Sequence, residues 1–62
     1  MSGLDGLMTA QEVADYCKVG LGRVDEARRS GELPHVEFGP KTIRFRPVDV
    51  ELWLAALLRE HP

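Results

Sequence analysis

A chain of 62 residues has room for one small domain, and too little depth for the multi-group pocket that most enzymes need. Its single cysteine excludes an internal disulfide, and no apolar stretch approaches the ~20 residues of a membrane span. The net charge of −2 argues against a nucleic-acid partner, but residues 18–46 hold seven of the eight basic side chains against four acidic ones. Because the local field steers a polyanion, the net charge excludes little.

Residues 1–6 lack both the basic region and the apolar run of a signal peptide, and they predict a flexible N-terminal extension on a cytoplasmic protein. Residues 7–60 are predicted to form the folded domain. The two histidines, His35 and His61, lie far apart, and only Cys17 could join them, which is not the spacing of a zinc site. Cys17 occupies an apolar helical position typical of a small core residue. We therefore expect no metal, no cofactor, no small-molecule ligand and no catalysis.

The first helix is predicted over Ala10 to Cys17. The segment Thr9–Glu12 reads as a capping box, with Thr9 as the N-cap and Glu12 reaching back from the third helical position. Met8 and Val13 are spaced for a hydrophobic staple across the same helix start.

A second helix is predicted over Leu21 to Arg29, with Gly20 as its N-cap. Gly31 is typical of a helix stop, and Pro34 follows shortly after it. Two short helices separated by a tight break indicate a helix-turn-helix.

The period of the apolar residues changes from 3.6 to 2 after the second helix. Val36 and Phe38 alternate with polar residues, as do Ile43 and Phe45, and residues 39–42 have the composition of a hairpin turn. The pattern predicts a two-stranded hairpin with one apolar face, which must lie on the helices because an isolated hairpin is marginal.

A last helix is predicted from Pro47, a favoured first position, to about Arg59. Its Trp53 is expected to pack between the helix-turn-helix and the hairpin, against Val36, Phe38 and Phe45. The fold class that results is α+β, a small winged helix-turn-helix with a hairpin wing and a C-terminal helix.

Residues 7–58 resemble the small MerR-like winged helix-turn-helix domains of the phage excisionase type. The resemblance rests on four elements in family order: T-x-x-E-V-A from Thr9, S-G-E-L-P from Ser30, I-R-F-R from Ile43 and D-V-x-x-W-L from Asp49. It implies DNA binding, with the second helix in the major groove and the wing along the adjacent backbone or minor groove. It also implies a recombination directionality factor, which bends attachment-site DNA so that a tyrosine integrase excises a prophage.

The second helix departs from the family pattern. It begins with Gly20 in place of the usual serine cap and contains Gly22, and it carries Asp25 and Glu26, whereas relatives usually have an aromatic and a basic residue in the middle of this helix. Either acid could accept a hydrogen bond from cytosine N4, but we favour a structural role for Asp25. The base-reading code of the family therefore does not transfer, and Glu26 stays a candidate DNA contact.

Three arginines of the second helix are candidate DNA contacts. Arg23 projects from the first turn, where an arginine can bridge guanine O6 and N7, and its structural alternative is an ion pair with Glu26. Arg28 and Arg29 lie in the last turn, where phosphate contact and a stabilising interaction with the helix C-terminus are equally consistent with the sequence.

The wing carries the clearest signal for DNA binding. Lys41 and Thr42 lie at its tip, and Arg44 and Arg46 are expected on its polar face, where Glu37 is the one acidic counterpart across the strands. The alternative is that these cations serve solubility alone.

The last helix is apolar over more than one face, and the excess at Leu54 and Leu58 predicts self-association of protomers along DNA. The alternative is that the N-terminal residues cover this patch.

Two other functions remain open from the sequence. One is a small transcriptional repressor or activator with the same fold. The other is a protein-interaction antirepressor that does not bind DNA, which the acidic second helix and the negative net charge favour. Salt separates these classes, since binding through phosphates weakens steeply as salt rises.

Overall fold

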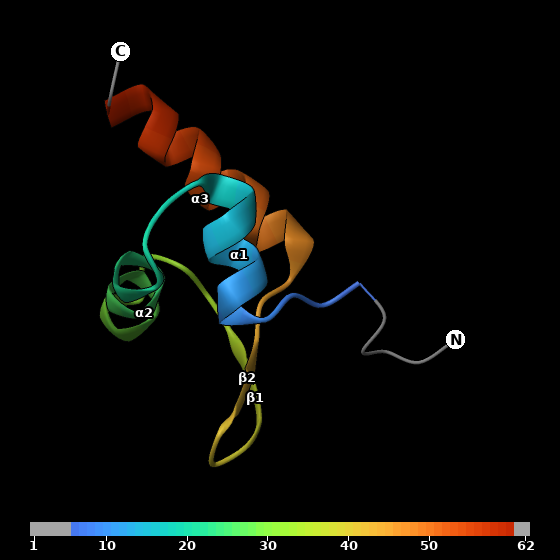
Figure 1. Ribbon diagram of the computed structural model, residues 1–62. Coiled ribbons are helices and arrows are strands. Elements are labelled where there is room, and N and C mark those ends of the chain that lie inside the picture. The colour runs from blue at the N-terminus through green and yellow to red at the C-terminus, as the bar shows by residue number, and fades with distance from the viewer. Residues whose placement is uncertain (1–5, 61–62) are drawn as a thin grey trace.

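The computed structural model describes residues 6–60, so that the expected N-terminal extension lies outside the described residues except for Gly6. Three helices and a hairpin follow one another in the order α1 (Ala10–Cys17), α2 (Leu21–Ser30), β1 (Val36–Gly39), β2 (Thr42–Arg44) and α3 (Pro47–Glu60) (Figure 1). In this part of the chain, no helix has both the length and the apolar character needed to cross a membrane.

Helix α1 has the bounds and the cap that the sequence predicts. The Thr9 hydroxyl accepts a hydrogen bond from the Glu12 N–H at 3.1 Å, and the Glu12 carboxylate accepts one from the Thr9 N–H at 2.8 Å. Val13 is fully buried and Met8 packs against the same core, as a hydrophobic staple requires. The helix ends at Cys17, and the C-cap residue Lys18 adopts the left-handed conformation, with φ of 60°.

Helix α2 ends one residue later than predicted, at Ser30. Gly20 is the extended N-cap residue, and Gly31 adopts the left-handed conformation that terminates the helix, with φ of 86°. Beyond this stop, the Leu33 N–H donates to the Ala27 carbonyl at 3.1 Å, and the Leu33 side chain is fully buried. The S-G-E-L-P segment therefore stops the helix and also returns an apolar side chain to the core, a role of Leu33 that is not among the predictions from the sequence.

The hairpin is present, but the prediction of one apolar face is wrong. Val36 lies opposite Arg44, and Glu37 lies opposite Ile43, in an antiparallel register interrupted between Glu37 and Gly39. Because directly opposed residues share a face, the apolar residues of the two strands lie on different faces. The physical reason is a β-bulge at Phe38, which adds one residue to β1 and shifts its alternation relative to β2.

The base of the hairpin is joined to the segment that precedes α1. Met8 and Phe45 exchange two backbone hydrogen bonds, each of 2.8 Å, and form an antiparallel bridge. The Phe45 side chain is fully buried, so this bridge fixes the wing to the core at its root.

One core joins the three helices to the root of the wing. Its buried residues are Val13, Ala14, Cys17, Val24, Ala27, Leu33, Phe45, Val50 and Trp53. Cys17 is a core residue as predicted. The expected packing of Trp53 is correct for Phe45, which lies in the same core, and wrong for Val36 and Phe38. The bulge explains the difference, because it leaves Phe38 52% exposed.

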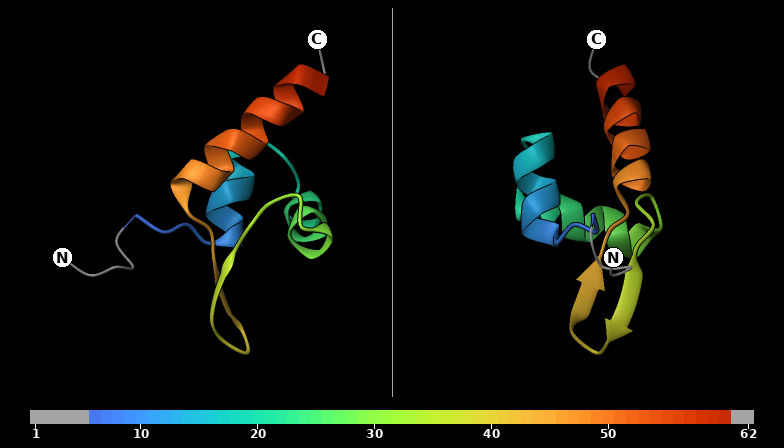
Figure 2. Two further views of the ribbon diagram at one scale, coloured as in Figure 1. Left: turned by 180° about the vertical axis from the view of Figure 1, so that it is seen from behind. Right: turned by 90° about the vertical axis from the view of Figure 1, so that its right-hand side faces the viewer.

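These elements form a small α+β winged helix-turn-helix, which confirms the predicted fold class. The three views of Figures 1 and 2 agree that the hairpin projects away from the helices, at the end of the molecule opposite the C-terminal end of α3. Helix α2 and the projecting hairpin are therefore the two candidate binding surfaces.

Candidate nucleic-acid interface

Helix α2 buries Val24 and Ala27, while Gly22, Glu26, Arg29 and Ser30 are exposed on its outer face. The outer face carries a shallow depression lined by Gly22, Asp25, Glu26, Arg29 and Ser30. A Cβ atom at Gly22 would meet no atom within 4 Å, so a partner can approach the backbone of the helix closely at this point. Because both acidic and basic side chains line this depression, the outer face of α2 is mixed in charge.

Arg23 is bound to α3 and to the segment after α2. Its guanidinium forms an ion pair with Glu32 at 3.0 Å and lies 5.5 Å from the centre of the Trp53 ring. The Trp53 indole N–H donates to the same Glu32 carboxylate. These contacts, the indole hydrogen bond first and the Arg23 hydrogen bond second, hold the pKa of Glu32 below its usual range. The predicted alternative, an ion pair with Glu26, is replaced by this one.

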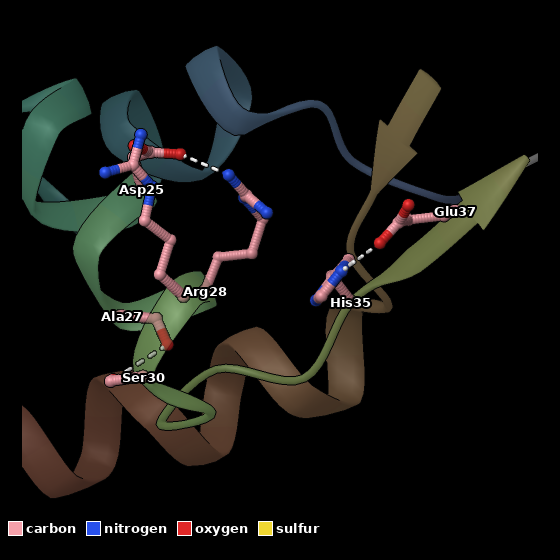
Figure 3. A network of polar contacts seen from close by, with 7 residues as sticks. Asp25, Ala27, Arg28, Ser30, His35 and Glu37 are labelled. Carbon is pink, nitrogen blue, oxygen red and sulfur yellow. Dashed lines mark hydrogen bonds and ion pairs between the residues drawn. The ribbon is translucent and has the colours of Figure 1, made fainter. Parts of the chain in front are cut away.

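Asp25 is paired with the two arginines of the last turn. The Arg28 guanidinium contacts it at 2.7 Å and that of Arg29 at 2.9 Å, and Figure 3 shows Arg28 reaching back along the helix to Asp25. The hydrogen bond from Arg28 is the main cause that lowers the pKa of Asp25. The Arg29 side chain is 73% exposed and the Arg28 side chain only 22%. Asp25 has the structural role favoured from the sequence, and Arg29 is the more accessible cation.

The wing differs from α2 in its ion pairs. Lys41 and Thr42 are exposed, Arg44 is half-buried, and within residues 6–60 neither Lys41 nor Arg44 makes an ion pair. The Arg44 guanidinium donates to the Ile43 carbonyl at 2.8 Å. Glu37, the acid expected to face the wing cations, contacts His35 instead, at 3.1 Å (Figure 3). Among the described residues, the wing therefore presents two cations without carboxylate partners, Lys41 in the turn at its tip and Arg44 at the root end of β2.

Arg46 lies beyond β2 rather than on the face of the hairpin. Its guanidinium contacts Asp49 at 2.7 Å, and its carbonyl accepts the N–H groups of Asp49 and Val50 at the start of α3. Asp49 is nearly buried, so this pair stabilises the entry to α3. Of the three cations predicted on the wing, Arg46 is the one whose guanidinium is engaged in an ion pair in the described part of the chain.

The apolar excess of α3 is divided between the core and the surface. Leu54 and Leu57 are half-buried against the core, while Leu58 is 66% exposed. With residues of the α1–α2 turn, these three leucines line an open hollow beside α3. The predicted interface residues Leu54 and Leu58 thus share one hollow, Leu54 in its wall and Leu58 at its exposed edge.

The described residues hold no cluster of three metal-ligating side chains. Cys17 is buried, and burial raises the pKa of its thiol, so the thiolate form is disfavoured. The outer surfaces of α2 and the wing carry the chemistry of binding, with cations, hydroxyls and the exposed carboxylates of Glu26 and Glu37.

A sequence model of helix-turn-helix domains matches residues 7–57. The match spans the region from the segment before α1 to the last turns of α3, and so includes the wing and the core. The same comparisons return no matching curated protein and no matching solved structure.

Proposed function

This chain belongs to the helix-turn-helix domain family, a family of DNA-binding domains, and within it we propose that the protein is an excisionase. Its ligand would be double-stranded DNA of a phage attachment site, in the cytoplasm of a bacterial host. It would bend that DNA and position a tyrosine integrase, which performs the strand exchange. The protein itself performs no chemistry in this proposal.

The observation that carries the proposal is the pairing of an outward helix with a projecting hairpin whose cations lack carboxylate partners. An α-helix fits the major groove of B-DNA. With α2 in that groove, the wing would lie over the adjacent backbone and minor groove. Lys41 and Arg44 would contact phosphates there, and Thr42 would donate its hydroxyl to the same backbone.

Arg23 is proposed as the base-reading residue of α2. To reach a guanine it must leave Glu32, to which it is bound at 3.0 Å. A partly exposed ion pair contributes ~0–1 kcal/mol, whereas a bidentate contact to guanine contributes ~1–3 kcal/mol. Exchanging the ion pair with Glu32 for a bidentate contact to guanine therefore favours the DNA-bound state. Glu32 would keep its hydrogen bond from Trp53.

The remaining candidates on α2 and near the wing would contribute in the order of their exposure. Arg29, which is highly exposed, would contact phosphate most readily, and Glu26 would accept from a cytosine amino group. Arg28 and Arg46 are held by Asp25 and Asp49, so we propose them as weaker phosphate contacts.

The experiment is a gel-shift titration of the full chain against duplexes that it selects from a random pool, with bending measured at each step. Affinity should fall steeply between ~50 and 200 mM salt, since each phosphate contact releases counterions. Stepwise, cooperative and bent complexes support an excisionase. One dimer on one palindrome identifies a transcriptional regulator instead. A chain that binds no duplex would be an antirepressor that acts by protein interaction. The ion pairs of the α2 arginines favour this second candidate function, because they reduce the positive charge available for DNA.

Self-association on DNA is the second part of the proposal, and Leu58 is its test. A head-to-tail contact through Leu54 and Leu58 would give open arrays along the duplex. Leu58→Glu should stay folded, because this side chain is 66% exposed, and should lose the cooperative complexes while keeping the first one. Leu52→Glu, at a site of equal exposure on α3, is the control. An unfolded Leu58→Glu chain, or one as cooperative as wild type, contradicts the interface.

A further inference from the structure

Phe38 is an aromatic side chain that the fold leaves in water. It was expected in the core, yet it is 52% exposed. It occupies the β-bulge of β1, where it is the extra residue between Glu37 and Gly39. Bulges bend a strand and re-aim a side chain, so the exposure follows from the backbone register.

Phe38 stands apart from the other exposed apolar residues. In the described part of the chain these are Tyr16, Leu21, Val48, Leu52 and Leu58, and all five lie on helices. Stable protein interfaces are built on contiguous apolar patches. A single aromatic side chain on a narrow ribbon offers too little area for one.

The charged residues of the hairpin that carries Phe38 favour, as its binding partner, a polyanion with an apolar interior. Lys41 and Arg44 of the same hairpin make no ion pair within residues 6–60, and the neighbouring Glu37 is engaged by His35. The hairpin is also the part of the molecule that projects farthest from the helices (Figure 2). A hairpin that carries both an exposed aromatic ring and cations without ion pairs among the described residues matches the chemistry of a DNA duplex, whose phosphates flank stacked bases.

The dimensions of DNA sharpen this match. The minor groove is only ~6 Å wide, too narrow for a two-stranded ribbon. A wing lying over it can enter only through individual side chains. Proteins that bend DNA from the minor groove insert apolar wedges, phenylalanine among them, between base steps.

We propose that Phe38 is such a wedge: the wing presses its ring into the minor groove, partly unstacks one base step and kinks the duplex toward the major groove. This inference rests on the proposed DNA binding and deepens it by assigning the bending to one residue. Flexible pyrimidine–purine steps would be the preferred sites, since they unstack most easily.

The test uses the full chain and duplexes that wild type selects from a random pool, labelled with 2-aminopurine at successive steps. Wild type should raise the fluorescence at one step and bend the duplex by roughly 20–90°, the range of apolar wedges. Phe38→Ala should still bind, with the fluorescence rise lost and the bend reduced to that of the free duplex. Phe38→Leu should retain part of both signals, because leucine is also an apolar wedge.

Leu52→Ala is the matched control, since it removes an exposed apolar side chain from α3 and should change neither signal. A Phe38→Ala chain that bends DNA as wild type does would overturn the wedge. So would a Phe38→Ala chain that fails to fold, because Phe38 would then belong to the core. Wild-type binding without unstacking contradicts the wedge alone, whereas wild type that binds no duplex contradicts the proposed function as well.

Discussion

Helix α2 and the wing carry similar numbers of basic residues, but they differ in how available these residues are. On α2, Arg23 is paired with Glu32, and both Arg28 and Arg29 are paired with Asp25. On the wing, Lys41 and Arg44 have no such partner within residues 6–60. A count of cations along the sequence therefore measures charge, while binding depends on the charge left after the fold has formed its own ion pairs.

The two regions would therefore meet DNA in different ways. Each arginine of α2 must exchange a carboxylate for a phosphate or a base, so its net gain is a difference between two interactions. The wing cations exchange only water, and their gain comes from counterion release. We expect α2 to discriminate between sequences and the wing to supply affinity.

The largest expected effect concerns the attachment of α2 to the core. Trp53 is 3% exposed, and its ring and N–H hold Arg23 and Glu32. Replacing a buried tryptophan by alanine costs ~3–5 kcal/mol, while a small domain has only ~5 kcal/mol or little more in total. Trp53→Ala should be largely unfolded at room temperature in a circular-dichroism melt. Trp53→Phe, which keeps an aromatic ring, should fold. A wild-type melt for Trp53→Ala would show that α2 is anchored by other contacts.

The next effect separates the recognition of a base by Arg23 from the contribution of Arg23 to the stability of the fold. Arg23→Ala should lose ~1–3 kcal/mol at its preferred site and relax the preference at one base pair. Binding to a library of single-base variants measures this. The free energy of unfolding should change by ~1 kcal/mol or less, since the pair with Glu32 is partly exposed. An unchanged ranking of sites would remove α2 as the reader, and selection by DNA shape would replace it.

The wing should respond differently. Lys41→Ala and Arg44→Ala should each weaken binding to all sequences about equally, and each should lower the salt slope by ~1. Titrations of preferred and random duplexes over a range of salt test both parts. Arg46→Ala is a comparison within the same segment, because Arg46 is already paired with Asp49 and should lower the slope less. A change in site ranking on removing Lys41 would contradict the division between the two regions.

The smallest effect is a dependence of stability on pH. The hydrogen bond from Trp53 and the contact with Arg23 lower the pKa of Glu32 in the folded state. A depressed carboxyl pKa contributes stability at neutral pH that is lost as the pH falls through the folded value. The melting temperature of wild type should drop on acidification below 4.5, the ordinary value, and Glu32→Gln should show a shallower drop. Glu26→Gln, at an exposed carboxylate, should follow wild type, and a Glu32→Gln profile parallel to wild type would argue against the Glu32 contacts.

The helices and their ends could be predicted because their signals are local. The capping box of Thr9 and Glu12, the stop at Gly31 and the start at Pro47 each act within a few residues. Leu33 could have been found by the same logic, since an apolar residue after a glycine stop often packs back on its helix.

The partners of the candidate site could not be predicted in this way. Glu32 reaches Arg23 across the end of α2, and Trp53 joins them from α3, so no spacing along the sequence reveals the set. The faces of the wing depend on one extra residue at Phe38, and a slip of one position reverses every side chain in a strand. Periodicity alone does not detect a bulge.

The bridge between Met8 and Phe45 bears on the order in which this chain folds. It closes a loop that runs from residue 8 to residue 45, whereas α1 and α2 are neighbours in sequence. Closing a longer loop costs more entropy, so the helix pair should assemble first and the wing root should dock last. We therefore expect the root of the wing to open locally as one unit while the helices remain folded. In native-state hydrogen exchange, the amides of Met8 and Phe45 should exchange together and ahead of those in the helices.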